Sequence, residues 1–177
     1  MQIIYLITTG GTIEKVYSEQ LGKVQNTANK IGQYLTRLRL PDCDVRVIPI
    51  MNKDSLEMTQ EDRIGLVAEM SRLLPEGHPF VITHGTDTMV ETGLYLQRTF
   101  PSLHVPVVLT GAMTPLGFEG SDGLQNLTES LMASRLLGPG VYIVMHGRVF
   151  PADHVRKDRD LGTFVETTQS VNPGGSE

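Results

Sequence analysis

The feature that most constrains the fold of this chain is a regular alternation of short apolar runs with segments of helical periodicity. Five runs of four to six residues, rich in Val, Ile, Leu and Phe, have the composition of buried strands. They span residues 3–7, 45–50, 80–83, 105–110 and 141–145. Apolar side chains at helical spacing occur within residues 26–39, 59–74, 88–100 and 121–132. This alternation predicts a flavodoxin-like, doubly wound α/β domain: a mainly parallel sheet covered on both faces, in three layers.

In a parallel sheet, every strand-to-helix turn lies at the same edge, and ligands bind at that edge. The turns of this chain carry residues able to take part in chemistry: Thr12, Ser55, Thr86 with Asp87, Ala112 with Met113, and Lys157. The segment His84-Gly85-Thr86-Asp87-Thr88, directly after the run 80–83, delivers a hydroxyl and a carboxylate together. We expect these turns to meet in one crevice.

The length and composition of the chain fit one compact domain. With 177 residues, of which 40% are hydrophobic, it can bury a sizeable core without metals or disulfides. We expect residues 1–165 to form this domain and residues 166–177, which contain Pro173-Gly174-Gly175, to form a flexible tail. Cys43 is the only cysteine, which excludes an intramolecular disulfide and a cysteine-based metal cluster.

Charge and hydropathy argue against two classes of partner. The net charge of −5 is unlike that of nucleic-acid-binding proteins, which usually present a basic face. The first residues lack the basic leader and long apolar core of a signal peptide, and no run approaches membrane-spanning length. We therefore expect no nucleic-acid or membrane partner, and a cytoplasmic location.

The turn residues suggest attack on a carbonyl by a hydroxyl. Threonine is a weak nucleophile that needs a neighbouring group to take its proton. Thr12 has Tyr17 nearby, in a polar segment of residues 14–25 whose length suggests a lid or functional loop. Thr86 has Asp87 beside it, and Lys157, with a pKa lowered by desolvation, would be the base of a Thr–Lys–Asp relay. Peptide N–H groups of the glycine turns at 10–11 and 85–86 would stabilise an oxyanion.

Each candidate also has a structural interpretation that the sequence leaves open. Thr-Gly-Gly-Thr at 9–12 occurs in tight turns and phosphate-binding loops. Asp87 and Thr88 could cap the following helix, and Lys157 could belong to a solvated charge cluster. Ser55 could supply a hydroxyl at the start of a helix, Cys43 could be a small buried thiol, and His84 could be a structural imidazole. Tyr17 could be a surface aromatic.

Three segments resemble the signature motifs of the bacterial-type L-asparaginase/glutaminase family. They are Thr9-Gly10-Gly11-Thr12-Ile13, His84-Gly85-Thr86-Asp87-Thr88-Met89 and Gly111-Ala112-Met113, in the order that the family has. Asp54-Ser55 resembles its substrate-binding turn, and Val155-Arg156-Lys157 resembles its lysine region. The resemblance covers about the first 165 positions and is especially to the short, single-domain members.

The resemblance implies a role for each matched side chain. Thr12 would be the nucleophile that forms an acyl-enzyme, with Tyr17 assisting its activation. Thr86, Asp87 and Lys157 would form a second catalytic group, and the order in which the two threonines act stays open. Ammonia would leave first, and water would then release aspartate. No metal or organic cofactor is implied.

The substrate-binding positions that the resemblance implies are Gly11, Asp54, Ser55, Gly85, Ala112 and Met113. Ser55 would hold the α-carboxylate, aided by backbone N–H groups. Asp54 and Asp87 would face the α-ammonium group. Ala112 would offer its carbonyl oxygen to the side-chain amide of the substrate.

The implied activity is hydrolysis of L-asparagine to L-aspartate and ammonia, and L-glutamine is a second candidate substrate. A pocket discriminates one methylene by only about 1–3 kcal/mol, so strict specificity is not expected. The resemblance also implies a homo-oligomer, a dimer or tetramer. Family members of ordinary length carry a C-terminal domain that completes a neighbour's amino-group site, and the printed sequence ends before it.

Two other functions are compatible with the same residues. One is the amidase component of a tRNA-dependent amidotransferase, against which the acidic balance weighs. The other is a non-catalytic amino-acid binding module, which would have no need of a lysine-linked relay. Ammonia release without a partner or tRNA would distinguish an L-asparagine hydrolase from both alternatives.

Overall fold

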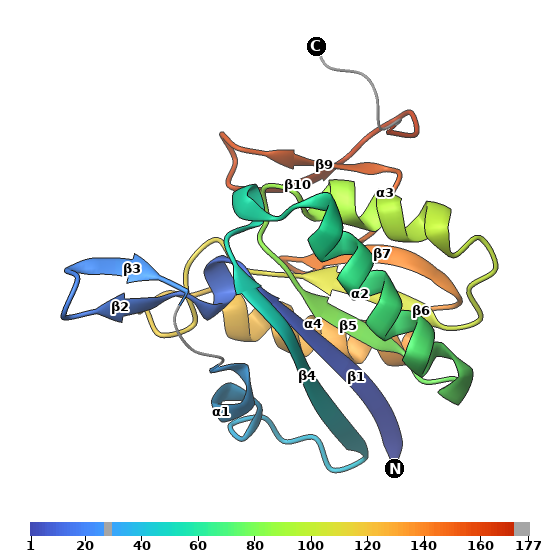
Figure 1. The fold of residues 1–177 in the computed structure, drawn as a ribbon, viewed down its shortest axis with the longest axis horizontal. Helices are drawn as coiled ribbons and strands as arrows, with labels where there is room; N and C mark the ends of the chain where they lie inside the picture. The colour runs from blue at the N-terminus through green and yellow to red at the C-terminus, as the bar shows by residue number, and fades with distance from the viewer. Residues whose placement is uncertain (27–29, 172–177) are drawn as a thin grey trace.

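The computed structural model describes residues 1–26 and 30–171. Its centre is a six-stranded sheet in the order β4-β1-β5-β6-β7-β8 (Figure 1). The strands are β1 Gln2–Gly10, β4 Cys43–Lys53, β5 Phe80–Thr83, β6 Pro106–Thr110, β7 Gly140–Met145 and β8 Arg148–Pro151. The first five in this order are parallel, and β8 pairs antiparallel with β7. The predicted doubly wound, mainly parallel sheet is confirmed.

Helices cover both faces of the sheet. They are α1 Ile31–Leu35, α2 Gln60–Leu73, α3 Met89–Thr99 and α4 Gly123–Leu136. Successive residues of a strand face opposite layers. Accordingly, Tyr5 and Ile7 of β1 pack in the core beneath α2 and α3, whereas Ile4 and Leu6 pack in the core beneath α1 and α4. These two cores are the physical basis of the three-layer arrangement.

The start of α2 is set by Thr59 and Asp62, whose three-residue spacing in the sequence resembles a capping box. The Thr59 hydroxyl accepts the Asp62 N–H at 3.3 Å, and the Asp62 carboxylate accepts the Thr59 N–H at 2.8 Å. This reciprocal pair satisfies two backbone donors that the first helical turn leaves without partners. The boundary of α2 was therefore readable from the sequence.

The polar segment of residues 14–25 differs from the loop that the sequence suggested. It contains an antiparallel hairpin, β2 Val16–Ser18 with β3 Lys23–Gln25, which projects from the body of the molecule (Figure 1). Within the hairpin Tyr17 is opposite Val24, an apolar cross-strand pair that favours the strand conformation. The helix predicted over 26–39 is also shorter than expected, and residues 27–29 lie outside the described residues.

A second hairpin carries the basic segment near the end of the chain. It consists of β9 Val155–Asp158 and β10 Thr163–Glu166, and it lies next to α3 (Figure 1). Val155 and Phe164 are fully buried in the core that α3 covers, so this hairpin is fixed by packing. The sequence analysis expected neither this hairpin nor the short antiparallel strand β8.

The proposed boundary between domain and tail stays a prediction. Thr167 donates its N–H to the His154 carbonyl at 3.0 Å, and Val171 donates to the Asp153 carbonyl at 2.7 Å. The residues after 171 lie outside the described part of the chain. None of the helices among residues 1–26 and 30–171 is both long and apolar enough to cross a membrane.

Candidate active site

The turns after β1, β4 and β5 lie in direct contact with one another. Gly11 has a φ of +78°, and a Cβ at this position would lie 2.4 Å from the Gly85 nitrogen. A Cβ at Gly85 would lie 2.5 Å from the Ser55 Oγ. Neither position has room for a side chain, so glycine is required for this close approach. The turns that carry Thr12, Ser55 and Thr86 therefore meet at one edge of the sheet, as the topology predicts.

Thr88 links the turn after β5 to the turn after β4. Its hydroxyl donates to the Ser55 carbonyl at 2.9 Å. Thr88 is the N-cap residue of α3, but its side chain makes no cap hydrogen bond. The capping interpretation of the Thr88 hydroxyl is therefore wrong, because this hydroxyl joins two turns instead.

The most complete cluster at this edge is formed by Thr86, Asp87 and Lys157. Lys157 Nζ donates to Thr86 Oγ1 at 2.7 Å and to Asp87 Oδ1 at 3.0 Å. The Lys157 side chain is only 17% exposed, so the interpretation as a solvated charge is wrong. Its strand β9 pairs Lys157 with the fully buried Phe164, which anchors the position of the lysine. An amine within hydrogen-bond reach of a hydroxyl has the geometry that proton transfer between the two groups requires.

Arg159 is a further partner of Asp87 that the sequence reading missed. Its guanidinium lies 2.8 Å from Asp87 Oδ1, the oxygen that Lys157 also contacts. Arg159 directly follows β9, in the turn that leads to β10, so strand periodicity does not indicate the direction of its side chain. Since the Arg159 side chain is 72% exposed, it adds only weakly to the energy of the cluster.

Thr12 is less completely engaged. It begins the 3₁₀ helix η1, Thr12–Glu14, and is half-buried. Within residues 1–26 and 30–171, its hydroxyl has no hydrogen-bond partner, and Tyr17 on β2 is 58% exposed. The structure therefore places Thr12 at the shared edge but does not join it to Tyr17.

The glycine N–H groups of this first turn are not available as oxyanion donors. Gly11 donates its N–H to the Lys53 carbonyl at 2.8 Å. Gly10 donates its N–H to the Glu14 carboxylate at 3.1 Å. An oxyanion needs donors that point at it and have no other partner. The expectation that N–H groups at 10–11 would serve this purpose is therefore wrong for the turn as it stands.

Ser55 and Asp54 occupy the turn after β4. Ser55 is 3% exposed, and its Oγ has no hydrogen-bond partner among the described residues. The helix-start role belongs to Asp54, which accepts the Leu56 N–H at 3.1 Å, so that interpretation of Ser55 is wrong. Asp54 also accepts a hydrogen bond from Lys15 at 2.5 Å, which holds the pKa of this carboxyl below its usual range. An unused buried hydroxyl thus lies beside a carboxylate that already binds an ammonium group.

A network of polar side chains holds the segment that follows β6. Asp122 accepts the Met113 N–H at 3.0 Å and contacts His146 Nε2 at 2.8 Å, while Asn126 donates to the Gly111 carbonyl at 3.0 Å. Burial raises the pKa of Asp122, but the hydrogen bonds from backbone N–H groups and His146 outweigh it and lower that pKa. Ala112 is fully buried. No sequence pattern linked Asp122 to Met113, so the function of Asp122 in fixing Met113 was missed.

His84 has the structural role that the sequence allowed. It is fully buried, with Nδ1 donating to the Gly85 carbonyl at 2.8 Å and Nε2 at 2.8 Å from the Thr92 hydroxyl. Burial lowers its pKa to about 4, so the imidazole is neutral near pH 7. The ring therefore supports the backbone of the Thr86 turn.

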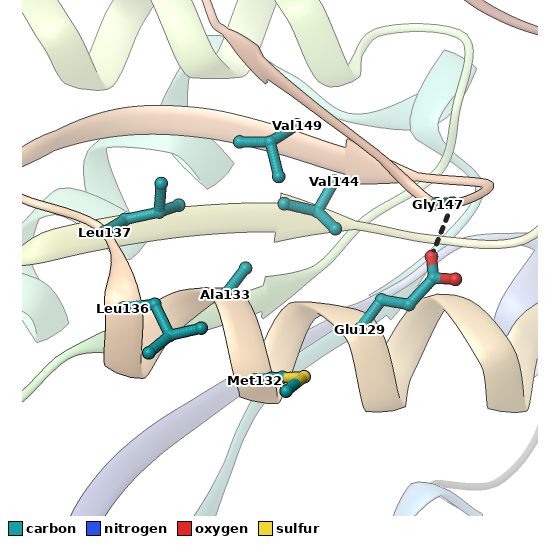
Figure 2. A pocket seen from close by; sticks show the side chains of 8 residues that line it. All are labelled: Glu129, Met132, Ala133, Leu136, Leu137, Val144, Gly147 and Val149. Atoms are coloured by element: carbon teal, nitrogen blue, oxygen red, sulfur yellow. Dashed lines mark hydrogen bonds between the residues drawn. The ribbon is translucent and has the colours of Figure 1, made fainter.

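Two hollows of similar size differ in their chemistry. The first, about 300 Å³, lies between α4 and the strands β7 and β8, and apolar side chains dominate its lining. Its one carboxylate, Glu129, is occupied by the Gly147 N–H (Figure 2). The second, about 320 Å³, lies beside the Thr12 turn and is lined by Lys15, Lys23, Val24, Gln25, Asn26, Asn52, Asp54 and Glu57. Only the second adjoins the cluster of turns, so the candidate site lies on that side of the molecule.

Comparison with known proteins identifies a family for the chain. The family model described as Asparaginase, N-terminal, matches residues 3–171. The L-asparaginase of Thermococcus kodakarensis is 31% identical over 169 residues, which cover 96% of this chain and 51% of that protein. A probable periplasmic L-asparaginase of Haemophilus influenzae is 32% identical over 181 residues, covering 97% of this chain and 50% of that protein.

Solved structures give the same result. The structure of the thermostable L-asparaginase from Thermococcus kodakarensis has a TM-score of 0.84 at 28% identity, covering 97% of this chain and 54% of that one. A probable cytoplasmic L-asparaginase from Campylobacter jejuni has a TM-score of 0.77 at 28% identity, covering 94% of this chain and 52% of that one. The chain thus spans about half the length of the curated relatives that it matches.

Proposed function

This chain belongs to the asparaginase family, in the N-terminal part that the family model describes, and we propose that it is an L-asparaginase. In this proposal it hydrolyses L-asparagine to L-aspartate and ammonia. The observation that carries the proposal is the contact of Lys157 with both Thr86 and Asp87, at the edge where the Thr12 and Ser55 turns meet. A hydroxyl, an amine and a carboxylate are thereby held in one water-poor cluster.

In the proposed reaction, Thr12 is the nucleophile. Its oxygen attacks the side-chain carbonyl carbon of asparagine, and Tyr17 takes part in moving the hydroxyl proton. The C–N bond breaks, ammonia leaves with that proton, and an ester joins Thr12 to the aspartyl group. Water then attacks the ester carbon, the ester bond breaks, and Thr12 regains its proton. Thr86, Lys157 and Asp87 handle the proton of the attacking group, a role that their hydrogen bonds support.

Substrate binding in this proposal uses the remaining turn residues. The partnerless hydroxyl of Ser55 takes the α-carboxylate. Asp54 and Asp87 take the α-ammonium group, which is consistent with the ammonium groups that both carboxylates bind now. Ala112 supplies a carbonyl oxygen to the substrate amide, and Gly11, Gly85 and Met113 shape the surface around it. L-Glutamine is included as a second, longer substrate.

The setting of the reaction is also a proposal. We infer a homo-oligomer, dimer or tetramer, that needs no metal or organic cofactor. Among the described residues, no group of three or more His, Cys, Asp or Glu side chains is placed to hold a metal ion. A cytoplasmic location stays a prediction, because the similar proteins include both a cytoplasmic and a periplasmic one by name.

An ammonia-release assay with the purified chain tests this function. L-Asparagine, D-asparagine and L-glutamine are compared in the wild type, in Lys157→Met and in the matched variant Arg159→Ala. We expect release from L-asparagine by the wild type, a loss of about 10²–10⁴-fold in kcat for Lys157→Met, and a loss of less than tenfold for Arg159→Ala.

Other outcomes would replace the proposal. Binding of L-aspartate without ammonia release would indicate an amino-acid binding module. Release that requires a partner protein and tRNA would indicate an amidotransferase component. Equal losses in Lys157→Met and Arg159→Ala would mean that net charge around Asp87 matters, and not the contact of Lys157 with Thr86.

A further inference from the structure

Glu14 is a buried carboxyl inside the turn that carries Thr12, and no step of the proposed reaction uses it. The residue is 2% exposed. Its Oε2 accepts the Gly10 N–H at 3.1 Å, whereas its Oε1 has no hydrogen-bond partner among the described residues. A buried polar atom without a partner is costly and uncommon in folded proteins. Burial of the Glu14 carboxyl therefore costs folding free energy, and no stabilising contact of Oε1 among the described residues offsets that cost.

The hydrogen bond from Gly10 to Glu14 closes the chain around Thr12. Gly10 is the last residue of β1, and Glu14 is the last residue of η1. Two backbone bonds reinforce the same turn, from the Glu14 N–H to the Gly11 carbonyl at 3.2 Å and from the Lys15 N–H to the Thr12 carbonyl at 3.1 Å. The backbone that carries Thr12 is thus held in a short closed segment, to which two side chains bond: Glu14 through the Gly10 N–H, and Asn26, whose Nδ2 donates to the Gly11 carbonyl at 3.0 Å.

The cations near this turn are paired with other acids. Lys15 of the same segment pairs with Asp54, and Lys53 at the end of β4 pairs with Asp62 at 2.8 Å. Lys157 of β9 pairs with Asp87. From the turn after β5, the buried His84 is neutral near pH 7. Within the described residues, therefore, no cation pairs with the Glu14 carboxyl.

Burial without a counter-charge raises the pKa of Glu14 to about 7, against the lowering effect of the Gly10 N–H. The carboxyl consequently gains or loses a proton close to neutral pH. In the ionised form, an uncompensated negative charge lies under the Thr12 turn, in a place that water does not reach.

We propose that Glu14 is a positioning residue for Thr12: its neutral carboxyl holds the turn closed, and ionisation of that carboxyl loosens it. The role of Glu14 in catalysis rests on the proposed function of Thr12, whereas its effect on the turn does not. Glu14 touches neither substrate nor reacting atoms in this arrangement. It sets the fraction of molecules in which the Thr12 hydroxyl is held in place.

Kinetics across pH test the catalytic part of this inference. Ammonia release from L-asparagine is measured from pH 5.5 to 9 for the wild type, Glu14→Gln, Glu14→Ala and the exposed control Glu166→Gln. Glutamine keeps an acceptor for the Gly10 N–H and cannot ionise. We expect the kcat ratio of wild type to Glu14→Gln to fall at least threefold as the pH rises through about 7, with KM nearly constant. Glu14→Ala should lose at least tenfold in kcat at every pH, and Glu166→Gln should match the wild type.

A constant ratio of wild type to Glu14→Gln, or equal losses in the Gln and Ala variants, would overturn this inference. Amide hydrogen exchange of Gly10, Gly11 and Thr12 gives a second readout that needs no activity. Comparison of wild type with Glu14→Gln at one pH cancels the intrinsic pH dependence of exchange. At pH 8.5 these amides should exchange several-fold faster in the wild type than in Glu14→Gln. At pH 5.5 they should exchange at the same rate in both proteins.

The two readouts separate the two proposals. If the wild type releases no ammonia but shows the exchange difference, the proposed function fails and the control of the turn by Glu14 stands. If exchange is the same in both proteins at every pH, the Glu14 inference fails whatever the activity.

Discussion

The two threonine turns of this molecule are built differently, although both lie at the carboxyl edge of the same sheet. Thr86 is 5% exposed and its hydroxyl accepts a hydrogen bond from Lys157 at 2.7 Å. Thr12 is half-buried, and among the described residues its hydroxyl has no partner. Its expected helper, Tyr17, is on a hairpin that projects from the body of the molecule (Figure 1).

The contrast extends to the buried titratable group beneath each turn. Under the Thr86 turn, His84 is satisfied at both ring nitrogens, and burial lowers its pKa to about 4. Under the Thr12 turn, Glu14 has one oxygen without a partner, and burial raises its pKa to about 7. One turn is therefore preorganised, whereas the other depends, in our proposal, on the proton of Glu14 and on help from Tyr17 of the hairpin.

The largest expected effect comes from removing either hydroxyl. Thr12→Ala and Thr86→Val should each lower turnover by about 10³-fold or more, because catalytic groups that act as a unit cannot replace one another. Acid quenching followed by intact-mass measurement would then distinguish the two turns. We expect an aspartyl ester on the wild type and on Thr86→Val, and none on Thr12→Ala.

The opposite pattern of ester formation would assign the attack to the preorganised Thr86 turn. Near-normal ammonia release by either variant would remove that threonine from the mechanism. Circular dichroism serves as the control, since neither substitution touches the two main cores and both variants should keep the wild-type spectrum.

The parts of this architecture that could be predicted are those with local causes. The five parallel strands follow from apolar runs, and the start of α2 follows from the capping pair Thr59 and Asp62. The proximity of the turns follows from parallel topology, because all strand ends lie at one edge.

The parts that could not be predicted depend on contacts between distant segments. Lys157 reaches Thr86 because Phe164, opposite it on β10, is buried against α3. The relay of Thr86, Asp87 and Lys157 was expected from its chemistry and from the family resemblance, but no local pattern shows the packing of Phe164 that positions the lysine. Likewise, the partnerless state of Glu14 Oε1 depends on cations that pair elsewhere, and the sequence alone shows only that Lys15 follows Glu14 in the chain.

A second, smaller effect concerns the free energy of unfolding, which should fall at acid pH. Because the pKa of His84 is about 4 in the folded chain and its ordinary value of 6.5 in the unfolded chain, the unfolded chain takes up a proton first as the pH falls. Stability supplied by neutral His84 is therefore complete above pH 6.5 and is lost as the pH falls towards 4, by up to about 3 kcal/mol. Urea unfolding at pH 7.5 and 4.5 measures this loss.

Variants isolate the contribution of His84 from that of the carboxylates. His84→Asn should reduce the difference between the two pH values, whereas the exposed control His104→Asn should leave it unchanged. If His84→Asn does not fold, NMR titration of the wild-type imidazole gives the answer directly. Protonation of His84 near pH 6.5 would show that the Thr86 turn is as open to water as the Thr12 turn.

The smallest expected effect concerns the hairpin and shows whether ligand completes the Thr12 turn. Adding L-aspartate should slow amide exchange across β2 and β3 by about tenfold, equal to about 1.4 kcal/mol of stabilisation, if Tyr17 closes over Thr12. Exchange in the middle of α2, which packs on the sheet away from the hairpin, should not change and serves as the internal control. Since the Thr86 turn is already hydrogen-bonded, its exchange should change less than that of the hairpin. Unchanged exchange at Tyr17 with aspartate bound would leave the hairpin as a fixed projection, and Thr12 would then need a different proton acceptor.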